Sequence, residues 1–66
     1  MKIIFNSKEM ELAEATTVSR LKQQAGLSGR AAAIAVNGKI VPATKHDIFT
    51  LSEGDEVIAI GAAYGG

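Results

Sequence analysis

The sequence contains no cysteine and a single histidine, His46. Without thiols the chain has no disulfide, no thiolate nucleophile, no side-chain persulfide and no zinc-thiolate site. One histidine excludes a multi-histidine metal site, and its polar neighbours at 44–47 predict a solvated loop residue. The glutamates Glu9, Glu11 and Glu14 are spaced like the solvated face of a strand and turn. We therefore expect no metal site and no independent catalytic centre.

Net charge and aromatic side chains are also scarce. Seven basic residues balance seven acidic ones, and the aromatics are two Phe and one Tyr. This composition lacks the electrostatic footprint of a nucleic-acid or anionic-membrane partner. No apolar run of about 18 residues and no signal-peptide layout is present. We expect one small cytoplasmic domain with a thin core and little room for a substrate pocket.

The first half of the chain is predicted to form a hairpin followed by a helix. Period-two alternation predicts strands over 1–5 and 9–13, joined by a turn at 6–8. Thr16 or Thr17 is the expected N-cap of the helix, and Gly26 sits where a left-handed C-cap is expected. The predicted apolar stripe is Val18, Leu21, Ala25 and Leu27, whereas Arg20, Lys22, Gln23 and Gln24 are predicted to face outward.

The second half contains the clearest local signal. Asn37-Gly38 between the apolar runs 32–36 and 39–41 predicts a hairpin with a two-residue type I′ turn, and Pro42 ends its second arm. Residues 43–53 hold weaker signals, with core anchors expected at Ile48, Phe49 and Leu51. A turn at Gly54-Asp55 precedes a last strand over 56–60.

The element order β-β-α-β-β-β predicts an α+β fold, because a single helix has to cover one face of one sheet. If the first and last strands lie side by side in parallel, the architecture is a β-grasp. This is a mixed sheet of four to five strands packed on one main helix. The strand order follows from analogy with that fold. We divide the chain into a β-grasp domain at 1–60 and a flexible C-terminal tail at 61–66.

The tail ends in Gly65-Gly66, two residues without side chains to pack and with free φ and ψ. Such an end passes through a narrow channel and presents a bare carboxylate to another protein; a frayed terminus is the plain alternative. Fully extended, 61–66 reaches at most about 20 Å. Gly65 and Tyr64 are thus candidates for threading a partner's active site.

Alternation in the last strand also suggests a docking surface. Val57 and Ala59 are expected on the helix side, which leaves Ile58 and Ile60 on the opposite face beside Ile4. Three β-branched side chains on an open sheet face suggest an interaction patch. The alternative is the ordinary scatter of apolar residues on protein surfaces.

The chain resembles the ubiquitin-like sulfur carrier proteins, most closely the ThiS family of thiamine biosynthesis. The correspondence runs along the whole chain without an insertion. It is carried by Met1 to Asn6, Thr17-Val18, Ala35-Val36-Asn37-Gly38, Ile40-Val41-Pro42, Gly54-Asp55-Glu56-Val57 and Gly65-Gly66.

The resemblance implies a mechanism centred on Gly66. A ThiF-like adenylyltransferase would use ATP and magnesium to convert the Gly66 carboxylate to an acyl-adenylate. Sulfur from a donor such as a cysteine desulfurase would then displace AMP and leave a thiocarboxylate. Thiazole synthase, ThiG, would take that sulfur into the thiazole ring. The chain itself would bind no cofactor and act as a protein cosubstrate, not an enzyme.

Three positions depart from the family pattern and leave the choice of partner enzymes open. Ala43 and His46 stand where these carriers often have Arg and Trp, and Tyr64 replaces the usual small or aliphatic residue before Gly-Gly. One alternative is a sulfur carrier for molybdopterin synthesis, like the small subunit of molybdopterin synthase. Another is a ubiquitin-like protein modifier or interaction module. An RNA-binding β-grasp domain is disfavoured by the zero net charge and few aromatics.

Overall fold

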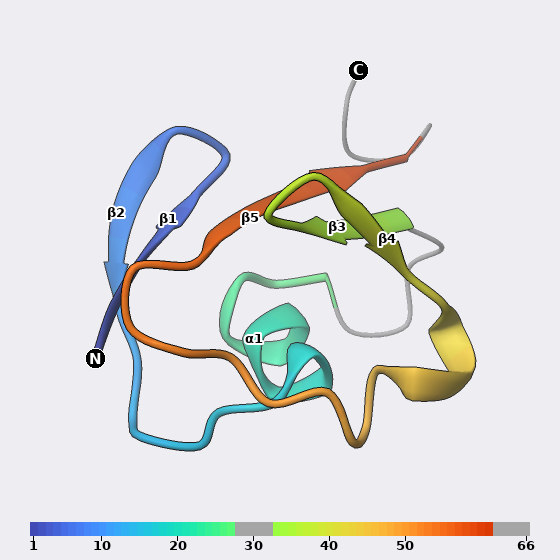
Figure 1. Cartoon of the computed structure of the whole chain (residues 1–66), viewed down its shortest axis with the longest axis horizontal. Helices are drawn as coiled ribbons and strands as arrows, with labels where there is room; N and C mark the ends of the chain where they lie inside the picture. The colour runs from blue at the N-terminus through green and yellow to red at the C-terminus, as the bar shows by residue number, and fades with distance from the viewer. Residues whose placement is uncertain (28–32, 62–66) are drawn as a thin grey trace.

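The computed structural model of the chain describes residues 1–27 and 33–61. Within them a five-stranded sheet lies against one helix, α1 (Figure 1). The elements are β1 (Lys2–Phe5), β2 (Lys8–Glu11), α1 (Val18–Gln24), β3 (Ala33–Val36), β4 (Lys39–Val41), the 3₁₀ helix η1 (Ala43–Lys45) and β5 (Glu56–Ile60). No helix among the described residues is both long and apolar enough to cross a membrane.

The strand order is β2-β1-β5-β3-β4, with β1 and β5 as a parallel pair near the middle of the sheet. In this pair Ile4 lies opposite Glu56, and Phe5 lies opposite Val57. The other neighbouring pairs, β1–β2, β3–β4 and β3–β5, are antiparallel. A mixed sheet with its helix on one face is the β-grasp arrangement, so the predicted fold is confirmed.

Both hairpins turn through two residues with positive φ. Asn37 and Gly38 have φ of 52° and 84°, which confirms the predicted type I′ turn. The first turn uses Asn6 and Ser7, with φ of 48° and 71°. It is one residue shorter than predicted, because Lys8 already belongs to β2.

The ends of α1 follow from its capping residues. Thr17 is the N-cap, and its side chain accepts a hydrogen bond from the Arg20 N–H at 3.2 Å. At the other end Gly26 has φ of 79°, and its N–H donates to the Gln23 carbonyl at 3.1 Å. The next N–H, of Leu27, reaches back to the last turn at 2.7 Å, which completes a Schellman motif. Both predicted caps are confirmed.

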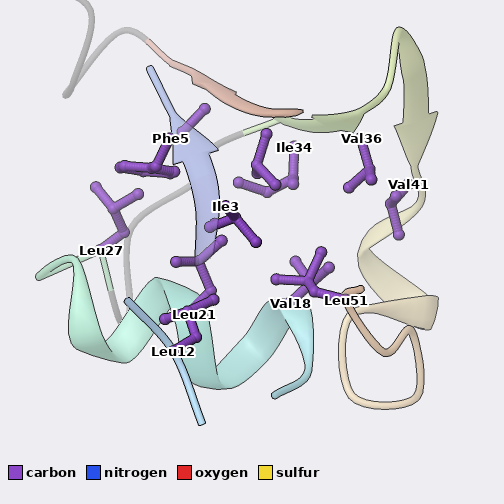
Figure 2. Packing of buried hydrophobic residues seen from close by; sticks show 12 residues of the cluster. Ile3, Phe5, Leu12, Val18, Leu21, Leu27, Ile34, Val36, Val41 and Leu51 are labelled. Carbon is purple, nitrogen blue, oxygen red and sulfur yellow. The ribbon is translucent and has the colours of Figure 1, made fainter. Parts of the chain in front are cut away.

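The core fills the space between the inner face of the sheet and α1, as Figure 2 shows. Its buried hydrophobic residues are Ile3, Phe5, Leu12, Val18, Leu21, Leu27, Ile34, Val36, Val41, Leu51, Val57 and Ala59. In β1, β3 and β5 every second residue is buried, as period-two alternation requires. The faces predicted for the first and last strands are confirmed, with Val57 and Ala59 toward the helix.

The segment after β4 differs from its prediction. Leu51 is buried as expected, but Ile48 is 67% exposed and Phe49 is 36% exposed. The prediction of both as core anchors is wrong. The chain turns through η1 and a further turn at 46–48, which directs His46 inward and Ile48 outward.

Candidate functional site

The strand that leads to the C-terminus, β5, lies inside the sheet and is held by two asparagine side chains. Asn37 Nδ2 donates to Asp55 Oδ1 at 3.0 Å, while Asn37 Oδ1 accepts the Glu56 N–H at 3.0 Å. At the far end of the strand, Asn6 Oδ1 accepts the Ala59 N–H at 2.9 Å. These bonds position β5 from its first residue almost to its last.

The predicted tail begins directly after β5. Gly61 is half-buried. The site residues Tyr64, Gly65 and Gly66 lie outside the described residues, as does the whole predicted tail after Gly61, so the division into a domain at 1–60 and a flexible tail at 61–66 stays a prediction. The roles of the three site residues stay predictions as well.

The predicted docking residues share the face of the sheet opposite α1, which we call the outer face. Ile58 is 42% exposed and Ile60 is 56% exposed, while Ile4 is half-buried. Because Ile4 lies opposite Glu56, it is a diagonal neighbour of Ile58 across β1 and β5. The predicted faces of β5 and β1 are therefore confirmed, and the docking role stays a prediction.

A further residue of this surface, Ile40, was not predicted from the sequence. Ala35 of β3 lies opposite both Ile40 of β4 and Ile58 of β5, so these three side chains form one row on the outer face. Ile40 is 63% exposed. The sequence does indicate that Ile40 and Ala35 share a face. The Asn37-Gly38 turn sets the register of the hairpin, and period-two alternation then places both side chains on the same side of the sheet. We call Ile4, Ile40, Ile58 and Ile60 the outer-face patch.

Charged side chains flank Ile4 of this patch on both neighbouring strands, β2 and β5. Glu9 and Glu56 both lie opposite Ile4, one on each neighbouring strand. Lys2 Nζ lies 3.7 Å from Glu9 Oε1. An apolar centre with a charged border is the usual anatomy of a protein–protein interface.

His46 is buried, which corrects the prediction of a solvated loop residue. It is 4% exposed, and its Nε2 lies 2.9 Å from the Val41 carbonyl oxygen. Because that carbonyl only accepts, Nε2 carries a hydrogen, and Nδ1 is left to accept from Lys22 Nζ at 3.3 Å. Lys22 is accordingly half-buried, so its prediction as an outward residue is wrong as well. His46 joins β4 to α1.

Replacing His46 by alanine should destabilise the fold. The variant loses the bond to Val41 and leaves a cavity, so we expect the free energy of unfolding to fall by about 2 kcal/mol. Urea denaturation measures this loss. Thr44→Ala, an exposed change two residues away, is the matched control and should stay within about 0.5 kcal/mol. Equal stabilities of the two variants would contradict the joining role of His46.

The α-amino group of Met1 is bound by several acceptors. It donates to the Leu12 carbonyl at 2.7 Å and lies 3.1 Å from Glu11 Oε2 and 3.3 Å from Glu14 Oε2. The hydrogen bond to Glu11 is the main cause that raises the pKa of this amine above its ordinary value of 8.0. The folded state therefore holds this proton more tightly than the unfolded state.

This shift predicts a pH dependence of stability. A raised pKa of the Met1 amine stabilises the fold fully below pH 8.0, and the contribution is lost as the pH rises through the raised value. Chemical denaturation at stepped pH should show a decline above pH 8 that is shallower in Glu11→Gln/Glu14→Gln. Identical slopes in the parent and the double variant would contradict the assignment.

Among the described ranges, no three or more His, Cys, Asp or Glu residues lie close enough together to hold a metal ion. The outer face instead presents exposed apolar side chains. The strand that leads to the C-terminus passes through it, and its outward side chains Ile58 and Ile60 belong to the patch.

Comparison with known proteins gives concordant results. A family model described as the ThiS family matches residues 3–66. The chain is 32% identical over 66 residues to the sulfur carrier protein ThiS of Escherichia coli (strain K12), covering 100% of both chains. The crystal structure of the thiamine biosynthesis protein ThiS from Geobacter metallireducens superposes with a TM-score of 0.84 at 23% identity, again over 100% of both chains.

Proposed function

The chain belongs to the ThiS family, and on that premise we propose that it is a sulfur carrier protein of thiamine biosynthesis. In this proposal Gly66 is the reacting residue. Its carboxylate is adenylated, converted to a thiocarboxylate, and used as the sulfur source for a thiazole ring. The chain supplies the reacting group but no catalytic group, so it acts as a cosubstrate of its partner enzymes.

Activation is needed because an α-carboxylate has a pKa of about 3.5 and is a poor electrophile when ionised. A ThiF-like adenylyltransferase, with ATP and magnesium, would form the Gly66 acyl-adenylate and release pyrophosphate. Hydrosulfide, or its equivalent from a donor such as a cysteine desulfurase, would add to the carbonyl carbon. Breaking the bond to AMP would then leave the thiocarboxylate. ThiG, the thiazole synthase, would consume it.

The outer-face patch is our proposed docking surface for these partners. It is apolar, exposed and continuous with β5, from which the last residues follow. From Gly61 the tail reaches at most about 20 Å. A partner held on the patch therefore needs its active site within that distance of the end of β5.

The observation that carries the proposal is the family match, which extends through Gly66. It is tested by incubating the protein with ATP, magnesium, a ThiF-like adenylyltransferase and sulfide, and then measuring the mass of the C-terminal peptide. Exchange of one oxygen for sulfur adds about 16 Da to that peptide. An unmodified peptide would overturn the proposal.

The same assay separates the alternatives. A ubiquitin-like modifier would give a much heavier species, in which Gly66 is joined to a lysine of another protein. For the thiocarboxylate form, purified thiazole synthase and the large subunit of molybdopterin synthase are offered in turn as sulfur acceptors. If the thiocarboxylate gave its sulfur only to the molybdopterin enzyme, the carrier would belong to molybdopterin synthesis and not to thiamine biosynthesis.

A further inference from the structure

A groove of about 680 Å³ lies between the β3–β4 hairpin and the segment that follows η1. Its lining includes Val36, Lys39, Ile40, Lys45, Ile48 and Phe49. All of the β4 residues line the groove and α1 contributes none, so the groove lies beside the sheet edge formed by β4.

The groove gathers exposed apolar side chains that have no function in the core. Ile40 is 63% exposed, Ile48 is 67% exposed and Phe49 is 36% exposed. All three line the same hollow, although they come from different parts of the chain. Three large apolar groups around one concave surface distinguish it from scattered surface hydrophobics.

The main chain beside the groove is open to pairing. β4 is the last strand in the sheet order, so its outer edge has no partner strand among the described residues. In a hairpin with a two-residue turn, the flanking residues Val36 and Lys39 form the hydrogen-bonded pair. Hydrogen-bonded and non-hydrogen-bonded pairs alternate along an antiparallel hairpin, so the next pair, Ala35 and Ile40, is not hydrogen-bonded. The N–H and C=O of Ile40 therefore point away from β3. An extended segment has a donor and an acceptor available there.

The rim of the groove is positively charged. Lys39 and Lys45 are both exposed, and neither forms an ion pair with a described residue. The one carboxylate in the lining, Asp55, is already bound by the Asn37 side chain at 3.0 Å and the Ser52 N–H at 2.8 Å. Both partners of Asp55 are neutral donors, so its carboxylate keeps its charge, and the lining carries two positive charges and one negative charge.

We propose that this groove binds an extended acidic segment of a partner protein. The segment pairs with the Ile40 main chain at the β4 edge and places an apolar side chain between Ile48 and Phe49. Its carboxylates lie beside Lys39 and Lys45. Extended peptides bind sheet edges in this way, with main-chain bonds for affinity and side-chain pockets for specificity. The inference does not depend on the chemistry at Gly66.

The experiment is a titration of ¹⁵N-labelled protein, followed by NMR, with a short blocked peptide that alternates glutamate and valine. The amides of 39–41 and 48–50 should shift together. A peptide in which lysine replaces every glutamate should produce no such shifts. Lys39→Glu/Lys45→Glu should weaken binding of the acidic peptide about tenfold, since the favourable charge contacts of both lysines become repulsive. Lys8→Glu, at the other edge of the sheet, is the matched control and should leave the affinity unchanged.

A second variant tests the apolar part of the groove. Ile48→Ser changes an exposed side chain, so its spectrum should stay well dispersed while the affinity falls. Shifts confined to the amides of Ile58 and Ile60 would assign the peptide to the outer face and overturn the proposal. Equal affinity for the two peptides, or no shift at millimolar peptide, would overturn it as well.

Discussion

Deletion of Gly66 is expected to abolish thiocarboxylate formation. The shortened chain still ends in a carboxylate, on Gly65, but that group is displaced by one residue, or about 3.5 Å, from the adenylyltransferase's reacting centre. A displacement of even 1 Å from reactive geometry costs about a hundredfold in rate. Mass measurement of the C-terminal peptide after incubation with the adenylyltransferase, ATP and sulfide reads this outcome directly.

A second variant lengthens the tail instead of shortening it. One extra glycine after Gly66 introduces no side chain and moves the carboxylate the other way, so it too should prevent modification. Thermal unfolding should be nearly the same for both variants and the parent, because we expect the tail to stabilise nothing. A large fall in melting temperature would show that the tail is part of the folded structure. If either variant were modified at the parent rate, the position of the terminal carboxylate in the adenylyltransferase would not matter, and the prediction would be wrong.

Neighbouring residues of β5 should respond in opposite ways to the same substitution. Val57 is 0% exposed, and Val57→Asp places an unpaired carboxylate in the core. We expect a loss of more than about 4 kcal/mol, enough to unfold most of the protein. Ile58 is 42% exposed on the outer face, so Ile58→Asp should fold. Circular dichroism and thermal unfolding distinguish the two variants.

The folded Ile58→Asp variant then tests the outer-face patch. A charge at the centre of an apolar contact is expected to lower kcat/KM for adenylation by about a hundredfold, the loss typical of an interface hot spot. Ile60→Asp should also weaken adenylation more than it destabilises the fold. Normal adenylation of both variants would remove the patch as a docking surface, while failure to fold would place these side chains in the core.

The elements that sequence reasoning predicted well are those whose causes lie within a few residues. The Asn37-Gly38 turn follows from the ease with which these residue types adopt positive φ. The helix limits follow from Thr17 at one end and Gly26 at the other. Alternation assigned Val57 and Ile58 to opposite faces of β5, as the structure has them.

The segment after β4 was predicted poorly because hydrophobicity was its only guide. Ile48 and Phe49 are more apolar than His46, yet His46 is the residue inside. Its ring is buried because Val41 and Lys22 supply a hydrogen-bond partner for each nitrogen. Those partners are in different elements, and nothing in the sequence around His46 indicates that they are near.

The sequence by itself determined the Asn37-Gly38 turn, the caps of the helix and the faces of the first and last strands, because turn chemistry and side-chain periodicity act between near neighbours in the chain. Its resemblance to a known family also directed attention to Gly66. Only the tertiary structure decided that Ile40 joins Ile58 across Ala35, that Asn6 binds the main chain of Ala59 53 residues away, and that a groove opens beside β4. These features arise where packing brings distant segments together, and that choice depends on the whole core, not on any local stretch of residues.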